Sequence, residues 1–234
     1  MHPLDNVIWH ALTTRQTEFA EACGEARRFL PDVTSLAAFR EPNHAGYQSL
    51  AGLLASGETA ILFLDEPFAP REGWSLVGAS GLLQMVCERI ISEHEDAGPR
   101  TRETAGVEIT PLGVKDTADM IELTALTKPG PFAKRTYELG TYLGIRHGGK
   151  LVAMSGERLK VAGYTEVSAV CTHPEHLGKG YAALLMREIM RGIRERGEIP
   201  FLHVRAHNAR AIALYERLGF QKRLQRHTVV VRKS

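Results

Sequence analysis

The chain has 234 residues, of which 44% are hydrophobic and 24% charged, as in ordinary globular proteins of one large domain or two small ones. No window approaches the ~18 uninterrupted apolar residues of a membrane-spanning helix, and the N-terminus lacks the basic and apolar regions of a signal peptide, so we expect neither a membrane anchor nor export. The three cysteines show no metal-ligand spacing and indicate reduced thiols in a cytoplasmic protein.

The net charge of +2 hides an asymmetry along the chain. Residues 1–105 carry 8 arginines, no lysine and 15 acidic residues, a net of −7, whereas residues 106–234 carry 21 basic and 12 acidic residues, a net of +9. A basic half suits a ligand with several phosphates. Arg187, Arg191 and Arg194 recur at helical spacing, however, as on a solvated helix face. We therefore predict no nucleic-acid partner.

The polar segment 93–106 contains Gly98 and Pro99 and is the best candidate for a linker. It divides the chain into a predicted N-terminal α/β domain, residues 1–105, and a second α/β domain, residues 106–234. In the first domain the patterns predict helices over 18–30 and 44–57, a buried strand over 59–66, and a strand or helix over 81–90.

The second domain is expected to follow the order β-α-β-β-β-α-β-α-β. Its first predicted elements are a strand over 107–113, a helix over 116–127 capped by Asp116, a loop over 128–132 and a hairpin over 141–159 that turns at Gly148–Gly149. A strand over 163–172, a helix over 181–196 and a strand over 201–206 follow. The domain ends with a short helix from Asn208 to Gly219 and two final strands, of which 227–232 is the clearer.

Two segments of this domain together indicate one ligand-binding site. The strand 163–172 leads through a turn with Gly178 and Gly180 into an apolar helix, an arrangement that presents free backbone N–H groups to phosphate oxygens. An ordinary strand–turn–helix junction gives the same pattern, so this signal alone is weak. The segment 203–220 follows one helix and one strand later and places Asn208 and Tyr215 near whatever the turn holds, which makes the combination far more specific.

These residues resemble the Gcn5-related N-acetyltransferase (GNAT) superfamily and, within it, the FR47-like group. The family's pyrophosphate loop, Arg/Gln-x-x-Gly-x-Gly/Ala, aligns with residues 177–182, where Gly180 and Ala182 match. Leu177 replaces the leading Arg/Gln, which removes a side chain but no backbone donor. Residues 208–220 are very similar to the second acetyl-CoA segment of ribosomal-protein alanine acetyltransferases. The resemblance covers about residues 106–234.

The resemblance implies a GNAT fold, a mixed central sheet flanked by helices, and in two-part members a degenerate acetyltransferase fold in the first half. It implies acetyl-CoA as cosubstrate and direct transfer of the acetyl group to a primary amine. The residues that it assigns to the cofactor are Val170, Cys171, Thr172, Gly178, Lys179, Gly180, Tyr181, Ala182, Ala183 and Asn208. Cys171 is not expected to be a nucleophile, because the family transfers the group directly. No metal is predicted.

The resemblance also suggests the catalytic groups. Tyr215 aligns with the family's general acid, since a phenol can protonate the coenzyme A thiolate, and we favour this role over the alternative of a core tyrosine on an amphipathic helix. Glu166 on the strand 163–172 and His203 on the next strand are the two candidate bases. Each also has a purely structural interpretation, and we favour Glu166.

Two other functions remain open at this point. A relative of the glycine N-acyltransferases would use a longer acyl-CoA, and a non-catalytic sensor would bind coenzyme A without turnover. The loop 128–132 is expected to contact the acceptor, and the acidic first half to help shape the acceptor pocket. Which amine is acetylated, and the oligomeric state, do not follow from the sequence.

Overall fold

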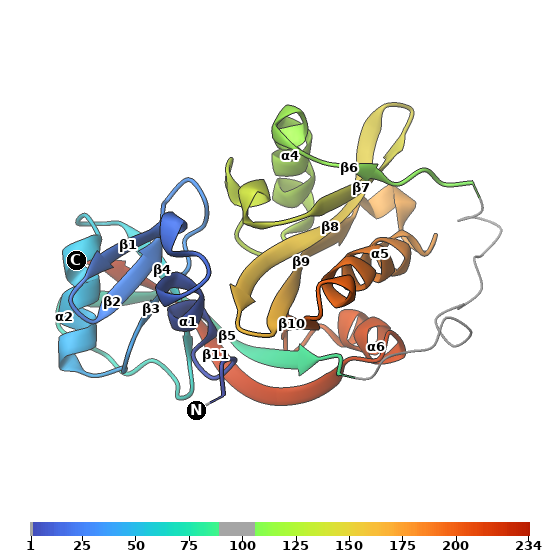
Figure 1. The fold of residues 1–234 in the computed structure, drawn as a ribbon. Helices are drawn as coiled ribbons and strands as arrows, with labels where there is room; N and C mark the ends of the chain where they lie inside the picture. Colours follow the sequence, from blue (N-terminus) through green and yellow to red (C-terminus); the bar gives the residue numbers. More distant parts are fainter. Residues whose placement is uncertain (1, 89–105) are drawn as a thin grey trace.

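The computed structural model describes residues 2–88 and 106–234. Figure 1 shows two lobes joined by two long strands. The first lobe contains residues 2–64 and the second contains residues 106–220. A mixed eight-stranded sheet in the order β4-β11-β5-β10-β9-β8-β7-β6 passes through both lobes, and a three-stranded sheet, β1-β2-β3, lies in the first. This mixed sheet with helices packed on it is the predicted GNAT fold class.

The first lobe and the strand that leaves it differ from the prediction over residues 18–30, and they include a helix over 7–13 and a strand over 37–39 that were not predicted. Their elements are α1 (Val7–Thr13), β1 (Ala20–Cys23), β2 (Ala26–Phe29), β3 (Ala37–Phe39), α2 (His44–Leu53), β4 (Thr59–Leu64) and β5 (Trp74–Val86). The helix predicted over 18–30 is wrong, because β1 and β2 form a hairpin there. Gly24 turns the hairpin with a φ of +46°, a conformation that ends a helix, and Phe29 is buried beneath α1.

The second lobe follows the predicted order of elements. They are β6 (Thr110–Pro111), α4 (Thr117–Thr127), β7 (Tyr142–His147), β8 (Lys150–Val161), β9 (Tyr164–Thr172), α5 (Tyr181–Glu195), β10 (Ile199–Arg205), α6 (Ala209–Arg217) and β11 (Gln221–Lys233).

Three details of the second lobe differ from the prediction. The strand expected over 107–113 is limited to Thr110–Pro111, and the two strands expected at the end are one bulged strand, β11. The Asp116 carboxylate accepts from Gly113 N at 3.0 Å, so it caps the preceding 3₁₀ turn rather than α4. Most of the candidate linker, residues 93–105, lies outside the described residues.

The central sheet draws strands from both sides of residue 105. β5 pairs antiparallel with β10 through residues such as Val86 and Phe201, and on its other edge it pairs with β11 along almost its whole length. β4 then pairs with β11 at the edge of the sheet. The division of the chain at residue 105 stays a prediction, and the sheet crosses it.

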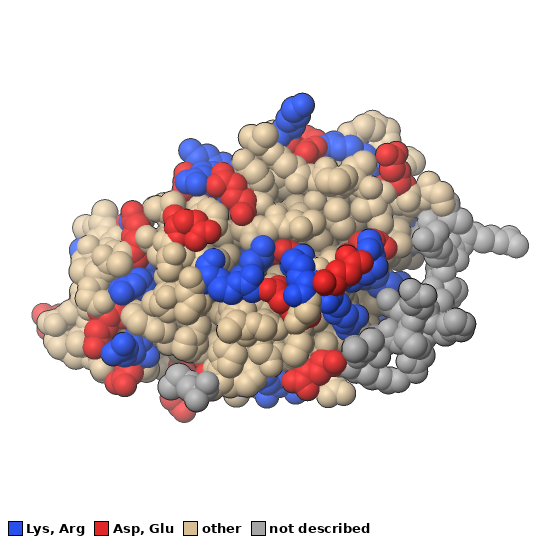
Figure 2. All heavy atoms as spheres, in the orientation of Figure 1, with Lys and Arg blue, Asp and Glu red and all other residues tan. Residues whose placement is uncertain are grey.

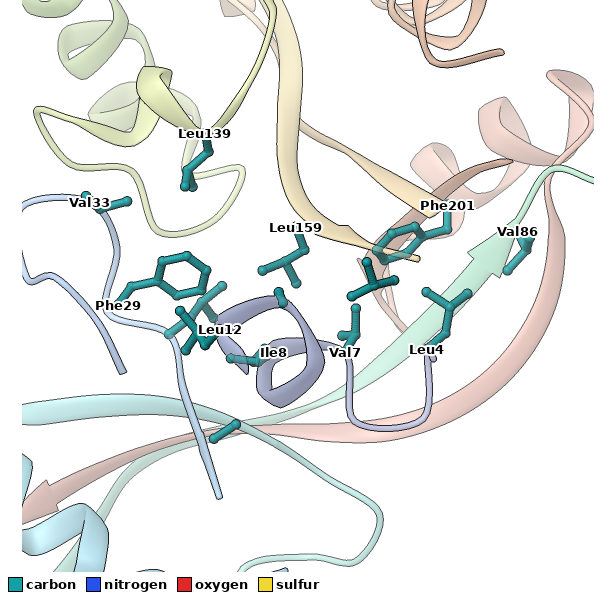
Figure 3. Close-up of a cluster of buried hydrophobic side chains, with 14 residues drawn as sticks. Leu4, Val7, Ile8, Leu12, Phe29, Val33, Val86, Leu139, Leu159 and Phe201 are labelled. Carbon is teal, nitrogen blue, oxygen red and sulfur yellow. The ribbon is translucent and has the colours of Figure 1, made fainter. Parts of the chain in front are cut away.

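A hydrophobic cluster fastens the first lobe to the second (Figure 3). Leu4, Ile8 and Leu12, from α1 and the turn before it, pack with Leu159 of β8 and Phe201 of β10, and all five side chains are at most 2% exposed. Each such burial stabilises the fold by roughly 1.5–3 kcal/mol. The cluster therefore holds α1 against β8 and β10.

Helices cover the part of the sheet that carries the site. Leu185, Met186, Ile189 and Ile193 of α5 are buried as their spacing predicts. Arg191 on the opposite face pairs with Glu188 and Glu195. Figure 2 shows Lys and Arg interspersed with Asp and Glu over this side of the molecule, rather than a single basic surface.

Candidate active site

The site begins where two parallel strands separate. β9 and β10 pair only at Ile199–Tyr164, Pro200–Thr165 and Phe201–Glu166. Beyond these pairs β9 continues to Thr172 and β10 to Arg205, and no further pair joins the two strands in the part of the chain that the structure describes. The edge of β9 that faces the gap keeps backbone donors and acceptors for a ligand.

A bulge changes the direction of β9 in this gap. Its register on β8 shifts between the Ser168–Gly156 and Cys171–Met154 pairs, and Ala169 has a φ of +52°. An L-residue in this left-handed region costs about 1–2 kcal/mol, which the regular pairing on either side must offset. Bulges re-aim the residues that follow them. In this chain those residues are 170–172, which the resemblance assigns to the cofactor.

A cavity of about 700 Å³ occupies the space between the end of β9, the start of α5 and the face of α6. Tyr215 lines it, as do all the predicted cofactor residues except Lys179. Lys179 lies in the same turn, with Nζ 3.4 Å from His176 Nδ1. The structure thus brings together in one wall residues that are far apart in the sequence.

The turn before α5 has the geometry of an anion site. Gly178 and Gly180 have φ values of +85° and +78°, and a side chain on Gly178 would meet nothing within 4 Å, so backbone conformation rather than space requires glycine there. α5 begins at Tyr181, and the first N–H groups of a helix have no intrahelical partner and carry its positive dipole end. These donors line the cavity.

The charge of the cavity agrees with that geometry. Arg187, Arg210 and Arg217 line it, and none of its lining residues within 2–88 and 106–234 is acidic. His176 also lines it, and burial together with Lys179 lowers the pKa of this histidine. The cavity is therefore suited to a polyanion of nucleotide size.

Tyr215 and Cys171 are the titratable groups of the inner wall. Burial raises the pKa of the Tyr215 phenol to about 12, with a further contribution from Cys171. Burial also raises the pKa of the Cys171 thiol to about 11. Both groups keep their protons at neutral pH, so Tyr215 can donate a hydrogen bond and Cys171 is a poor nucleophile. Asn208 caps α6 by accepting from Ala211 N at 3.2 Å, as predicted.

Glu166 and His203 are not part of the cavity lining, and the structure joins them into one unit. Glu166 Oε1 lies 2.7 Å from His203 Nδ1, and Arg158 donates to both carboxylate oxygens at 2.8 Å. All three side chains are at least nine-tenths buried. Against the cost of burial, Arg158 and His203 lower the pKa of Glu166 to about 2. The two candidate bases thus share one ion pair.

A glutamine determines the protonation of His203. Gln84 Oε1 accepts from Arg223 Nη1 at 2.7 Å, and Gln84 Nε2 donates to Leu4 O at 3.0 Å, which together orient the amide. The same Nε2 lies 3.1 Å from His203 Nε2, so we assign the histidine as neutral, with its proton on Nδ1 and donated to Glu166. Burial also lowers the pKa of His203.

Sequence analysis did not identify Arg158 or Tyr142 as parts of the site. Tyr142 packs against Gly156, where a side chain would come within 2.4 Å of its ring. Its hydroxyl is buried, has no hydrogen-bond partner among the described residues, and interacts electrostatically with Arg158, Glu166 and Cys171. The alternation of the hairpin indicates only that Tyr142 faces the core, so the sequence contains no signal for this position.

The loop 128–132 closes over this tyrosine. Pro129, Gly130, Pro131 and Phe132 enclose a small hollow with Tyr142 and the bulge residues Ser168 and Ala169. The Phe132 ring meets the Tyr142 ring edge-on at 5.8 Å between centroids. Within the described ranges, no group of three or more His, Cys, Asp or Glu side chains could hold a metal ion.

Comparison with known proteins agrees with this architecture. The family model of the FR47-like proteins matches residues 142–230. The N-alpha-acetyltransferase RimI of Mycobacterium tuberculosis is 33% identical over 135 residues, which cover 52% of this chain and 83% of RimI. A putative acetyltransferase of the GNAT family from Novosphingobium aromaticivorans is 37% identical, with a TM-score of 0.86 and full coverage of both chains.

A GCN5-related N-acetyltransferase from Kribbella flavida shares the fold at 18% identity, with a TM-score of 0.62 over 97% of this chain and 94% of its own. The separated parallel strands, the glycine turn and the cavity between α5 and α6 define an acetyltransferase fold. The chain belongs to the GNAT superfamily, in its FR47-like group.

Proposed function

We propose that this protein is an acetyl-CoA-dependent N-acetyltransferase that transfers the acetyl group directly to a primary amine. The observation that carries the proposal is the cavity, which combines the backbone donors of the α5 turn, three arginines and the Tyr215 phenol. The phosphates would bind the turn and the arginines, and the pantetheine arm would follow the free edge of β9 toward the bulge. The three cysteines of the chain, all within the described residues, form no disulfide with one another, which suits the proposed cytoplasmic location.

The transfer forms one bond and breaks another. The amine nitrogen attacks the thioester carbonyl, whose oxygen would accept from a backbone N–H in the 170–172 segment. The C–N bond forms, the C–S bond breaks, and the leaving thiolate takes a proton from Tyr215, which is protonated at neutral pH. The nitrogen loses one proton as the amide forms, and this proton restores the Tyr215 phenol. The cavity therefore supplies binding, polarisation and a proton donor.

The ammonium form of the acceptor must lose a proton, and Glu166 with His203 remains our proposed acceptor of it. Both Glu166 oxygens already accept from Arg158, and the free nitrogen lone pair of His203 faces Gln84. In this arrangement the Glu166–His203 pair takes the proton of the acceptor amine either through an intervening group or after it gives up a hydrogen bond to Arg158 or Gln84.

The experiment is release of free thiol from acetyl-CoA in the presence of amines, amino acids and short peptides, with Tyr215→Phe as the control variant. We expect turnover with one acceptor class and a loss of about 10²-fold or more in kcat for Tyr215→Phe, with acetyl-CoA binding unchanged. In the same assay, replacing Pro129-Gly130-Pro131 is expected to raise the KM of the acceptor.

The alternatives predict different results. Faster turnover with longer acyl-CoAs would indicate an acyltransferase resembling the glycine N-acyltransferases. Tight binding of acetyl-CoA with no acceptor-dependent release would favour a sensor. A Tyr215→Phe variant as active as the unaltered chain would remove the proposed acid.

A further inference from the structure

The first lobe contains a second cavity, which shares no lining residue with the one between α5 and α6. It has a volume of about 140 Å³ and lies between the start of α1, the strands β3 and β4, and Arg226 of β11. An interior space of about this size accommodates a molecule as large as benzene. Neither the family resemblance nor the proposed transfer uses this cavity.

Arg226 gives the cavity its chemistry. The residue is 7% exposed, and its Nη2 lies 2.9 Å from Asp65 Oδ1 in an ion pair. Its Nε is buried and has no hydrogen-bond partner within residues 2–88 and 106–234. A buried donor without a partner costs about 1–3 kcal/mol, and more on a charged group. An anion that accepts from this guanidinium would relieve the cost, and its planar fork matches a carboxylate.

The surrounding charges leave room for a negative ligand. Arg40 also lines the cavity, and Arg223 pairs with Asp5 at its edge. Asp65 is 71% exposed, so its pairing with Arg226 is open to solvent. The lining carries two arginines and two aspartates, whose charges balance, and Arg223 beside Asp5 adds one further positive charge.

The remaining walls are apolar and limit what the anion carries. Ile8, Phe39 and Phe63 line the cavity. We propose that this cavity is a second ligand site that binds a small carboxylate with a short apolar body, its carboxylate on Arg226 and its hydrocarbon against these three side chains. The Phe63 ring also packs against His203, with 4.8 Å between centroids. A ligand here would thus lie one side chain away from the Glu166–His203 pair.

The test is calorimetric titration of the full chain with isovalerate and benzoate, with isoamylamine as the cationic control of similar shape. Acetyl-CoA and acceptor are left out, so the result is independent of the proposed acetyl transfer. We expect one saturable site for both carboxylates and none for the amine. Arg226→Met should weaken the affinity at least tenfold and Arg226→Lys by less, because lysine keeps the charge but not the fork.

Arg232→Met is the matched control, since Arg232 is exposed on the same strand and does not line the cavity; its affinity should equal that of the unaltered chain. Thermal unfolding of each variant shows that it is folded. Absence of saturable binding, equal binding of isoamylamine, or undiminished affinity in folded Arg226→Met would overturn the proposal.

Discussion

Cys171 and Tyr215 lie in the same wall of the cavity, and burial favours the protonated form of both side chains. Removing a thiol and a phenol from water disfavours their anions, which raises the pKa of Cys171 to about 11 and that of Tyr215 to about 12. A protonated phenol can serve as a proton donor, whereas a protonated thiol cannot serve as a nucleophile. This single effect separates the roles of two neighbouring residues.

We predict that Cys171→Ala keeps turnover within about one order of magnitude, because direct transfer uses no thiol, whereas removing a true nucleophile costs many orders of magnitude. The measurement is kcat in the thiol-release assay, with Cys23→Ala as the control because Cys23 lies on β1, away from the cavity. A collapse of kcat in Cys171→Ala alone would show that the acetyl group passes through the cysteine.

At the scale of elements, β8, β9 and β10 are linked by buried charges. Arg158 of β8 and Glu166 of β9 form an ion pair, and His203 of β10 is hydrogen-bonded to it, at the point where β9 and β10 separate. Backbone pairing between these two strands ends at Glu166, so side chains carry the connection there. A buried pair of this kind need not add net stability, but breaking it leaves an uncompensated charge.

Glu166→Gln is therefore expected to lower the free energy of unfolding by about 3–5 kcal/mol, since Arg158 stays buried without a carboxylate. A double variant, Arg158→Met with Glu166→Met, should recover much of that loss in urea unfolding. If the pair also moves the proton of the acceptor, kcat stays low in the double variant. Full recovery of both stability and kcat would assign the pair a purely structural role.

The same pair predicts how stability depends on pH. The pKa of Glu166 falls from 4.5 to about 2 on folding, and burial lowers the pKa of His203 from 6.5. In both cases the unfolded chain binds the proton more tightly, so the stabilising contribution is present above the unfolded pKa and is lost as pH falls. The free energy of unfolding should decline below about pH 6.5 and further below 4.5. A constant value in urea titrations from pH 7 to 4 would contradict this.

At the scale of the whole molecule, the two lobes share one sheet. β5 lies between β10 and β11, and the α1 cluster packs on β8 and β10. The active-site strands therefore depend on a strand from the first part of the chain. The first lobe also carries the second cavity, whose wall residue Phe63 packs against His203.

We predict that residues 106–234 do not fold alone, because without β5 the strands β10 and β11 lose their common neighbour and expose apolar surface. Circular dichroism and thermal unfolding of this fragment should show no cooperative transition. Production together with residues 1–105 as a separate chain is expected to restore the transition and coenzyme A binding. Cooperative unfolding of the isolated fragment would instead show an independent domain.

Much of the second lobe was predictable because its signals are local. The glycine turn, the amphipathic α5 and the Asn208 cap each depend on residues within a few positions of one another, and all three are present as expected. The hairpin of β1 and β2 was missed because its residues favour a helix locally and pair as strands only through Gly24 and the packing of Phe29. Among the helices of the described residues, none has both the length and the apolar character needed to span a membrane.

The sequence alone determined the family resemblance, the order of elements in the second lobe and most of the residues that line the cavity between α5 and α6, because motifs at fixed spacing encode local backbone geometry. The tertiary structure alone decided the insertion of β5 between β10 and β11, the joining of Glu166 and His203 through Arg158 and Gln84, and the cavity at Arg226. Most of these features depend on contacts between residues that are 30 to more than 100 positions apart in the sequence. Gln84 and His203, for example, are separated by 119 positions. Long-range pairing and burial, which no local pattern records, set the charges that the site can use.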